Sequence, residues 1–298
     1  MMLRPDYSMH AFHVAAAGRR TEIWRLILGV VLMVLLYVSL GIMYQQAIVF
    51  ATDGSDAFIS ELVSGVTPRA MYVLLFSFGL ITIAVFSVVQ LLHRRPGFSV
   101  IGPRALAFPQ FIRVTFFLSV LGAVLVVLPP YDMGGDLVPN LAPGYWSLLL
   151  PVSLLAVFIQ ISAEEIFFRG YLQQQLAARF RSPLVWMVLP SLLFAVGHYQ
   201  PSEAGENALL ITLWAGIFGM LMADLTARAG SLGPALAVHF VNNVTAILIT
   251  SLPDSLGGLA LFHTPFGMDD PEALRAWLPV DFALMITSWL VARLALRR

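Results

Sequence analysis

The sequence predicts an all-α, polytopic membrane protein with about eight transmembrane helices and both termini in the cytoplasm. Three observations predict this fold: the composition, the number of long apolar runs and the distribution of arginine. Of the 298 residues, 59% are hydrophobic and only 11% are charged, against roughly 25% charged in an ordinary soluble domain. So few charges cannot cover a water-exposed surface, which excludes a soluble enzyme and a disordered chain. The absence of cysteine also excludes disulfides and thiolate metal sites.

Eight apolar runs approach or exceed the roughly 20 residues that a transmembrane helix needs. They occupy residues 26–46, 70–92, 110–128, 146–168, 184–200, 207–226, 232–251 and 280–296. The first run is too long for the apolar part of a cleaved signal peptide, and we expect it to remain as the first span. No internal repeat stands out. The sequence therefore predicts one membrane domain over residues 1–298, in which residues 1–25 form a cytoplasmic N-terminal segment.

Arginine gives the predicted orientation, because short cytoplasmic segments of membrane proteins are enriched in positive charge. All 17 basic residues are arginines, and 15 of them fall in alternate segments between the runs. The remaining segments hold only Arg69 and Arg275, and they carry most of the acidic residues. This alternation supports both the number of spans and the cytoplasmic location of the two termini.

The partner that the composition implies is a lipid bilayer and not a nucleic acid. Basic and acidic residues balance at 17 each, so the chain has no overall basic field that would attract a polynucleotide. The use of arginine without lysine is typical of a GC-rich bacterial coding sequence. We therefore expect a multi-pass protein of the bacterial inner (cytoplasmic) membrane.

Ionisable residues inside the apolar runs mark a candidate site, because each costs at least about 2.5–3.5 kcal/mol to insert. The fourth run contains Glu164, Glu165 and Arg169. Glu165 and Arg169 are four residues apart on a helix and are expected to pair, whereas Glu164 points about 100° away. This spacing predicts one paired, structural carboxylate and one that is chemically available. The alternative is that both glutamates only satisfy Arg169 or neighbouring helices.

Two other helices are expected to bring polar groups to the same depth. Glu164 and His198 are equally far along the chain from the short turn between the fourth and fifth runs, so an antiparallel hairpin places them level with each other. In the seventh run, His239 and Asn243 are four residues apart and share a helical face. A lone polar residue of this kind is more often a structural hydrogen-bonding group. Together, the three helices predict a polar cluster in the cytoplasmic half of the bilayer.

Such a cluster suits hydrolysis of an amide by two routes, which the residues alone leave open. In the first route, Glu164 and His198 activate a water molecule as general base, and His239 and Asn243 stabilise the oxyanion. In the second route, Glu164, His198 and His239 bind a divalent metal such as zinc, whose bound water attacks the carbonyl carbon.

The motifs resemble those of the CPBP family of intramembrane proteases, also called the Abi or type II CAAX prenyl endopeptidase family. That family is marked by EExxxR, FxxxH and HxxxN or HxxxD on successive membrane helices. Here the three motifs occur in the same order and with unbroken spacing, at residues 164–169, 194–198 and 239–243. The expected catalytic core helices cover residues 146–250.

The resemblance implies an endopeptidase that cleaves a membrane-associated peptide or protein at a site open to the cytosol. It implies that Glu164 is the water-activating base, assisted by His198. It also implies that His239 and Asn243 form an oxyanion hole or join a metal shell, while Glu165 and Arg169 brace the first motif.

Two other classes of function compete with proteolysis. Members of the same family are associated with bacteriocin self-immunity, so a non-catalytic immunity protein or membrane scaffold is the first alternative. A transporter is the second, because intramembrane carboxylates and histidines also relay protons. The sequence has no repeat and no matching pair of broken helices, which are common in transporters.

Several polar residues outside the cluster have structural interpretations. Asp224 and Arg228 are four residues apart and are expected to pair at the inner end of the sixth run. His10, His13 and His263 lie outside the runs and are expected to be ordinary interfacial or loop residues.

Overall fold

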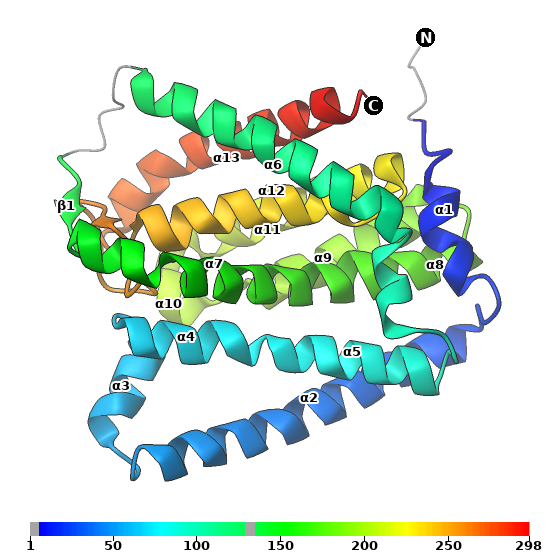
Figure 1. The fold of residues 1–298 in the computed structure, drawn as a ribbon, viewed down its shortest axis with the longest axis horizontal. Helices are drawn as coiled ribbons and strands as arrows, with labels where there is room; N and C mark the ends of the chain where they lie inside the picture. The colour runs from blue at the N-terminus through cyan, green and yellow to red at the C-terminus, as the bar shows by residue number, and fades with distance from the viewer. Residues whose placement is uncertain (1–5, 129–134, 298) are drawn as a thin grey trace.

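A computed structural model describes residues 6–128 and 135–297, and it shows a bundle of helices that run along one common direction (Figure 1). Its α-helices are α1 (His10–Val14), α2 (Ile23–Ala51), α3 (Asp56–Ser64), α4 (Pro68–Ser77), α5 (Gly79–Leu91), α6 (Arg104–Val127), α7 (Pro143–Glu165), α8 (Gln174–Arg179), α9 (Leu189–Gly197), α10 (Pro201–Ala204), α11 (Ala208–Ala229), α12 (Gly233–Val244) and α13 (Pro271–Leu296). The other elements are the 3-10 helices η1 (Ala15–Ala17), η2 (Gly97–Ile101) and η5 (Gly205–Asn207), the π-helical segments η3 (Ile166–Gln173), η4 (Leu184–Val188) and η6 (Thr245–Ile249), and the strands β1 (Val138–Pro139), β2 (Thr250–Ser251) and β3 (Phe262–His263).

Most of each of the eight predicted apolar runs is helical. Within the described ranges, six helical stretches are long and apolar enough to cross a membrane, and two shorter apolar helices cover Leu184–Gly197 and Gly233–Ile249. The all-α, multi-pass membrane fold is therefore confirmed. Helix α1 and the C-terminal end of α13 lie at the same end of the bundle (Figure 1), as an even number of crossings requires. That this end faces the cytoplasm stays a prediction from the arginine distribution.

Helix α12 can be short because other helices enclose it. It packs against α6, α7, α11 and α13, and its first seven residues are all buried. A helix that contacts protein on all sides does not have to satisfy its backbone ends in lipid. The approach to α6 is close: a Cβ added at Gly233 would collide with the carbonyl oxygen of Ala107. The missing side chain therefore fixes the position of the helix that carries His239.

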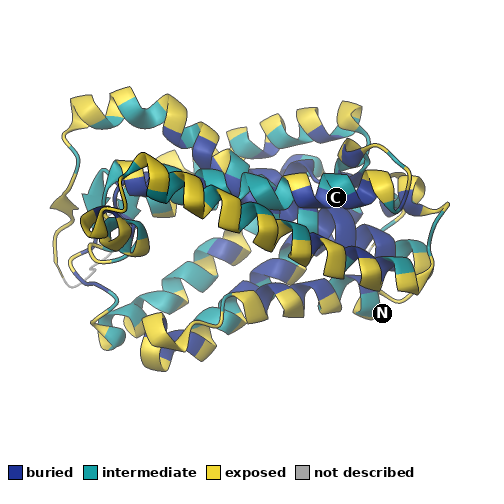
Figure 2. Ribbon diagram, turned by 90° about the horizontal axis from the view of Figure 1, so that it is seen from below, coloured by how far each residue is buried: buried dark blue, intermediate teal, exposed yellow. Residues whose placement is uncertain are grey.

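The outer helices expose apolar side chains, as a surface in contact with lipid requires. On α2, Leu35 is 59% exposed and Met43 is 67% exposed. Figure 2 shows exposed residues along the outward faces of the peripheral helices and buried residues concentrated in the interior. Water would oppose this distribution, whereas acyl chains solvate it.

A small sheet, which the sequence did not predict, closes the end of the bundle opposite α1 (Figure 1). Its strand order is β1–β3–β2, with β1 antiparallel and β2 parallel to β3. The sheet joins the segment before α7 to the segment after α12, which are the two helices that carry the glutamate and histidine motifs. His263 lies in β3, half-buried.

The predicted pair of Asp224 and Arg228 is confirmed, at 2.8 Å between the guanidinium Nε and a carboxylate oxygen. The carboxylate also accepts hydrogen bonds from the Tyr7 hydroxyl at 2.8 Å and from the Trp289 indole N–H at 3.0 Å. Asp224 thus ties the N-terminal segment to α11 and α13.

The expectation for His10 and His13 is wrong, because both side chains are buried. Residues 1–5 of the N-terminal segment lie outside the described chain, but α1 packs against α8 and α11. The His13 Nε2–H donates to the carbonyl oxygen of Arg169 at 3.1 Å, and the His10 ring lies 4.4 Å from the ring of Trp186. The segment is part of the folded core because η3 offers it polar partners that the apolar pattern of the fourth run conceals.

We predict that these two histidines make stability fall in mild acid. Burial lowers the pKa of His10 to about 3 and that of His13 to about 4, from an ordinary value of 6.5. Below pH 6.5 the two histidines bind protons in the unfolded chain but stay neutral in the folded chain. The free energy of unfolding should therefore fall by about 1.4 kcal/mol per pH unit for each histidine, between pH 6.5 and 4.

Denaturant titration in micelles at a series of pH values measures this slope. Substitution His13→Gln should flatten it, whereas the matched change His263→Gln at the half-buried β3 position should not. An identical slope in all three proteins would contradict the assignment.

Candidate active site

The three sequence motifs meet in the bundle interior, on α7 with η3, on α9 and on α12. Helix α7 ends at Glu165 and continues without a turn as the π-helical segment η3, which carries Arg169. Helix α12 packs against α7, and α9 packs against η3. The glutamates therefore face the histidine of α12, while the arginine lies toward α9.

Glu165 is the centre of the buried polar network. Its side chain is fully buried, and its Oε1 lies 3.1 Å from Arg169 Nη1 and 2.9 Å from His239 Nδ1. The pairing predicted between Glu165 and Arg169 is therefore confirmed. An ionised carboxylate only accepts hydrogen bonds, so the Nδ1–H of His239 donates to Glu165. This contact leaves Nε2 as the ring atom that faces the rest of the site.

Glu164 lies on the other side of the same histidine. Its Oε2 is 3.5 Å from His239 Nε2, and its side chain keeps 13% of its surface exposed while Glu165 keeps none. The two adjacent carboxylates thus differ as the sequence predicted, because one is enclosed and paired with Arg169 and the other remains accessible.

Asn243 reaches Glu164 through a residue that the sequence analysis did not single out. The Asn243 Nδ2–H donates to Gln160 Oε1 at 2.8 Å, and the Gln160 Nε2–H donates to Glu164 Oε1 at 2.9 Å. Gln160 is a polar residue in an apolar run, four positions before Glu164, and that spacing was the signal that could have identified it. One oxygen of Glu164 is therefore held by an amide, and the other faces His239.

Phe194, the first residue of the FxxxH motif, contacts three of the site residues. The Arg169 guanidinium lies 4.5 Å from the centre of its ring, and the rings of His198 and His239 lie 4.3 and 6.4 Å away. The phenyl face offers a favourable surface to a cation in a region with few polar partners. The motif spacing therefore places the ring of Phe194 against that of His198, one helical turn away.

His198 lies near the cluster, but none of the hydrogen bonds among the described residues joins it to Glu164. Its Nδ1–H donates to the carbonyl oxygen of Phe194 at 2.8 Å, which leaves Nε2 unprotonated in the neutral ring. The level placement with Glu164 assumed two regular α-helices. Both helices contain π-helical segments, η3 and η4, in which residue counting no longer gives depth.

The metal interpretation stays a prediction. Within the described residues there is no group of three or more His, Cys, Asp or Glu side chains that could hold a metal ion. Glu164 and His239 present converging donor atoms, but His198 is not placed with them, so the three predicted ligands do not fit a site with three protein ligands in this arrangement.

Two comparisons with known proteins show the family of the chain. Residues 146–245 match the family described as type II CAAX prenyl endopeptidase Rce1-like. The chain is also 30% identical over 271 residues to the uncharacterized protein YyaK of Bacillus subtilis (strain 168), an alignment that covers 86% of this chain and 87% of the relative. The chain belongs to the Rce1-like CAAX endopeptidase family. The resemblance drawn from the three motifs is confirmed, and the family is one of CAAX-type proteases. No solved structure matches the chain.

We predict that removing the buried cation is far more destabilising than removing an exposed one. Arg169→Gln leaves Glu165 buried without its charge partner, which should lower the free energy of unfolding by about 3–5 kcal/mol. The matched change Arg69→Gln breaks an ion pair with Glu61 in which the arginine is 64% exposed, and it should have little effect. Denaturant titration in micelles compares the two variants. Equal losses would contradict a structural role for the buried pair.

Proposed function

We propose that the protein is an intramembrane endopeptidase that hydrolyses a peptide bond in a membrane-associated peptide or protein. The observation that carries this proposal is that one histidine contacts two adjacent carboxylates in two different ways. His239 is hydrogen-bonded to the buried Glu165 through Nδ1 and faces the accessible Glu164 across 3.5 Å through Nε2. An arrangement built only for stability has no need of the second, accessible carboxylate.

In the proposed mechanism, a water molecule hydrogen-bonds to Glu164 Oε2 beside His239. As the water oxygen attacks the carbonyl carbon, its proton passes to Glu164, which acts as general base. The hydrogen bond from Gln160 holds the other oxygen and keeps the carboxylate turned toward the water. The protonated Glu164 then gives this proton to the amine that leaves.

The oxyanion that forms on the carbonyl oxygen needs donors that are already in place. In the proposed mechanism, His239 supplies Nε2–H, and the negative charge of Glu165 supports the protonated ring from the other side. Asn243 breaks its hydrogen bond to Gln160 and donates the same amide N–H to the oxyanion. His198 lies one turn from Phe194 at the edge of the cluster, and we propose that its free Nε2 assists proton transfer on the substrate side.

Loss of Glu164 should abolish proteolysis and leave the fold intact. Glu164→Gln keeps the shape of the side chain but removes the base, which we expect to lower the rate by about 10²–10⁴-fold. The measurement compares new peptide termini in membranes of cells that carry wild-type or variant protein at equal expression. The matched control, Glu203→Gln, changes an exposed glutamate on α10 and should behave as wild type.

The same comparison separates the competing functions. Termini that appear with wild type and Glu203→Gln but not with Glu164→Gln identify both a protease and its substrate. If no terminus depends on Glu164 in several growth conditions, the protease proposal fails and a non-catalytic immunity protein or scaffold takes its place. Transport activity that requires Glu164 without any new terminus would favour the transporter.

Asn243 and Gln160 should have separable effects on the rate. Asn243→Ala removes a donor to the oxyanion and is expected to lower kcat by about 10²–10³-fold. Gln160→Leu removes only the amide that orients Glu164, so it should lower kcat less, on the order of tenfold. Rates measured on a substrate found in the preceding experiment test this order. Equal effects would mean that Asn243 acts only through Gln160.

We propose the cytoplasmic membrane of a bacterium as the location. The relative in Bacillus subtilis and the exclusive use of arginine support this placement. The arginine-rich end of the bundle would then face the cytosol, and the candidate site would be reached from that side.

A further inference from the structure

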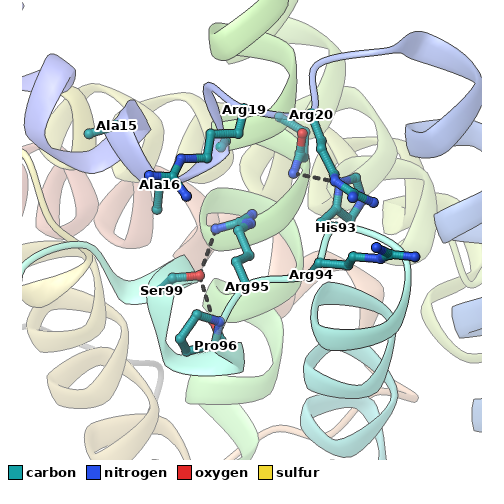
Figure 3. A pocket seen from close by; sticks show the side chains of 11 residues that line it. Ala15, Ala16, Arg19, Arg20, His93, Arg94, Arg95, Pro96 and Ser99 are labelled. Carbon is teal, nitrogen blue, oxygen red and sulfur yellow. Dashed lines mark hydrogen bonds between the residues drawn. The ribbon is translucent and has the colours of Figure 1, made fainter.

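A second polar site lies at the arginine-rich end of the bundle, outside the proteolytic cluster. It is a pocket of about 580 Å³ between the segment that joins α1 to α2 and the segment that follows α5. Four arginines contribute to its lining, Arg19 and Arg20 from the first segment and Arg94 and Arg95 from the second. Figure 3 shows Arg19 and Arg95 entering from opposite sides, while Arg94 extends away from both.

No acidic side chain lines this pocket. Within the described residues, none of its four arginines forms an ion pair. The acid nearest to it in sequence, Glu22, pairs instead with Arg25 at 3.0 Å, and Arg25 is not a lining residue. Cations that gather around one cavity repel one another, and a bound anion would relieve this repulsion.

The side chain of Arg95 is fixed by contacts within the pocket, unlike an arginine that extends into solvent from the surface. Its partners are neutral: Nη1–H donates to the Ser99 hydroxyl at 2.8 Å, and Nη2–H donates to Gln175 at 3.1 Å in the amide orientation that satisfies both groups. Its Nε is buried without a hydrogen-bond partner among the described residues. Burial lowers the pKa of Arg95 to about 10, as expected for a cation that lacks a nearby carboxylate.

The walls of the pocket hold the arginines in place. Arg20 donates to the carbonyl oxygen of Leu92 at 3.2 Å, so it also caps the end of α5. The imidazole of His93 is buried between Gln175 and Tyr171, at 3.2 and 2.9 Å. The position of the site is therefore set by helix ends and by a buried polar chain.

We propose that this pocket binds a phosphate group, and that the natural source is the headgroup of an anionic phospholipid. Guanidinium groups match phosphate oxygens in charge and in hydrogen-bond geometry. Basic pockets at the ends of transmembrane helices suit lipid headgroups. The surroundings favour a lipid over a soluble anion, because the helix ends that flank the pocket expose large apolar side chains: Leu91 on α5 is 80% exposed and Trp24 on α2 is 50% exposed. Acyl chains would cover these side chains while the phosphate enters the pocket.

Native mass spectrometry of the full chain in a neutral detergent tests the proposal, and it needs no proteolytic activity. The probes are dioleoyl phosphatidylglycerol, which is anionic, dioleoyl phosphatidylcholine, which is zwitterionic, and inorganic phosphate. The pocket variant combines Arg19→Gln and Arg95→Gln. The matched control combines Arg179→Gln and Arg181→Gln, which removes the same charge from two exposed positions outside the pocket. We expect one saturable phosphatidylglycerol site that the pocket variant binds at least tenfold more weakly and the control binds normally.

Each other outcome has a defined meaning. Binding of inorganic phosphate that depends on Arg19 and Arg95, without such binding of phosphatidylglycerol, keeps the phosphate site but makes its source soluble. Phosphatidylglycerol binding that is equal in wild type and the pocket variant overturns the proposal. So does a loss of equal size in the pocket and control variants, which would indicate general charge attraction. If the double variant fails to fold, Arg19→Gln alone replaces it, because Arg19 is exposed and forms no hydrogen bond with the described chain; a loss of several fold is then expected.

Discussion

The enclosed charge pair of Glu165 and Arg169 is the constraint on which the rest of the interior depends. Two opposite charges in a region of low dielectric constant are stable there only if they are in close contact and other protein groups pack around them. Phe194 of α9 covers the guanidinium, and His239 of α12 contacts the same carboxylate oxygen, Oε1, that faces Arg169. The need to enclose this pair therefore fixes how α7, α9 and α12 approach one another, and the accessible Glu164 takes its position from the same contacts.

Small residues make this enclosure possible. The side of α12 that faces α6 begins with Gly233, where even one added carbon has no room. In α11, an added Cβ at Gly219 would lie only 3.0 Å from the Cβ of Ser191 in α9. In lipid, helices gain little from burying apolar surface against one another, so close packing must provide much of the attraction. The glycine contacts thus bring the helices close enough together to enclose the polar network.

The sequence was informative where a polar residue interrupted an apolar run, and uninformative where the partner was decided by tertiary contacts. It predicted the eight helices, the pairing of Glu165 with Arg169 and the pairing of Asp224 with Arg228. It could not place His198, because its depth depends on two π-helical segments that no local pattern reveals. It also missed the burial of His13, since a five-residue helix has no periodicity and its partner, the Arg169 carbonyl, lies 156 positions away. Gln160 is a polar residue in an apolar run, but its partner Asn243 lies on another helix, 83 positions away.

The π-helical turn in η3 gives this chain an unusual sensitivity to its own length. One side of that helix presents Arg169 to the charge pair, and Tyr171, two residues later, contacts His93 next to the arginine pocket. The π-helical turn already holds one residue more than an α-helical turn, so a further residue inserted between Arg169 and Tyr171 would rotate everything beyond it by about 100°. The two regions could then no longer both face their partners. The chain is therefore expected to tolerate no inserted residue between Arg169 and Tyr171.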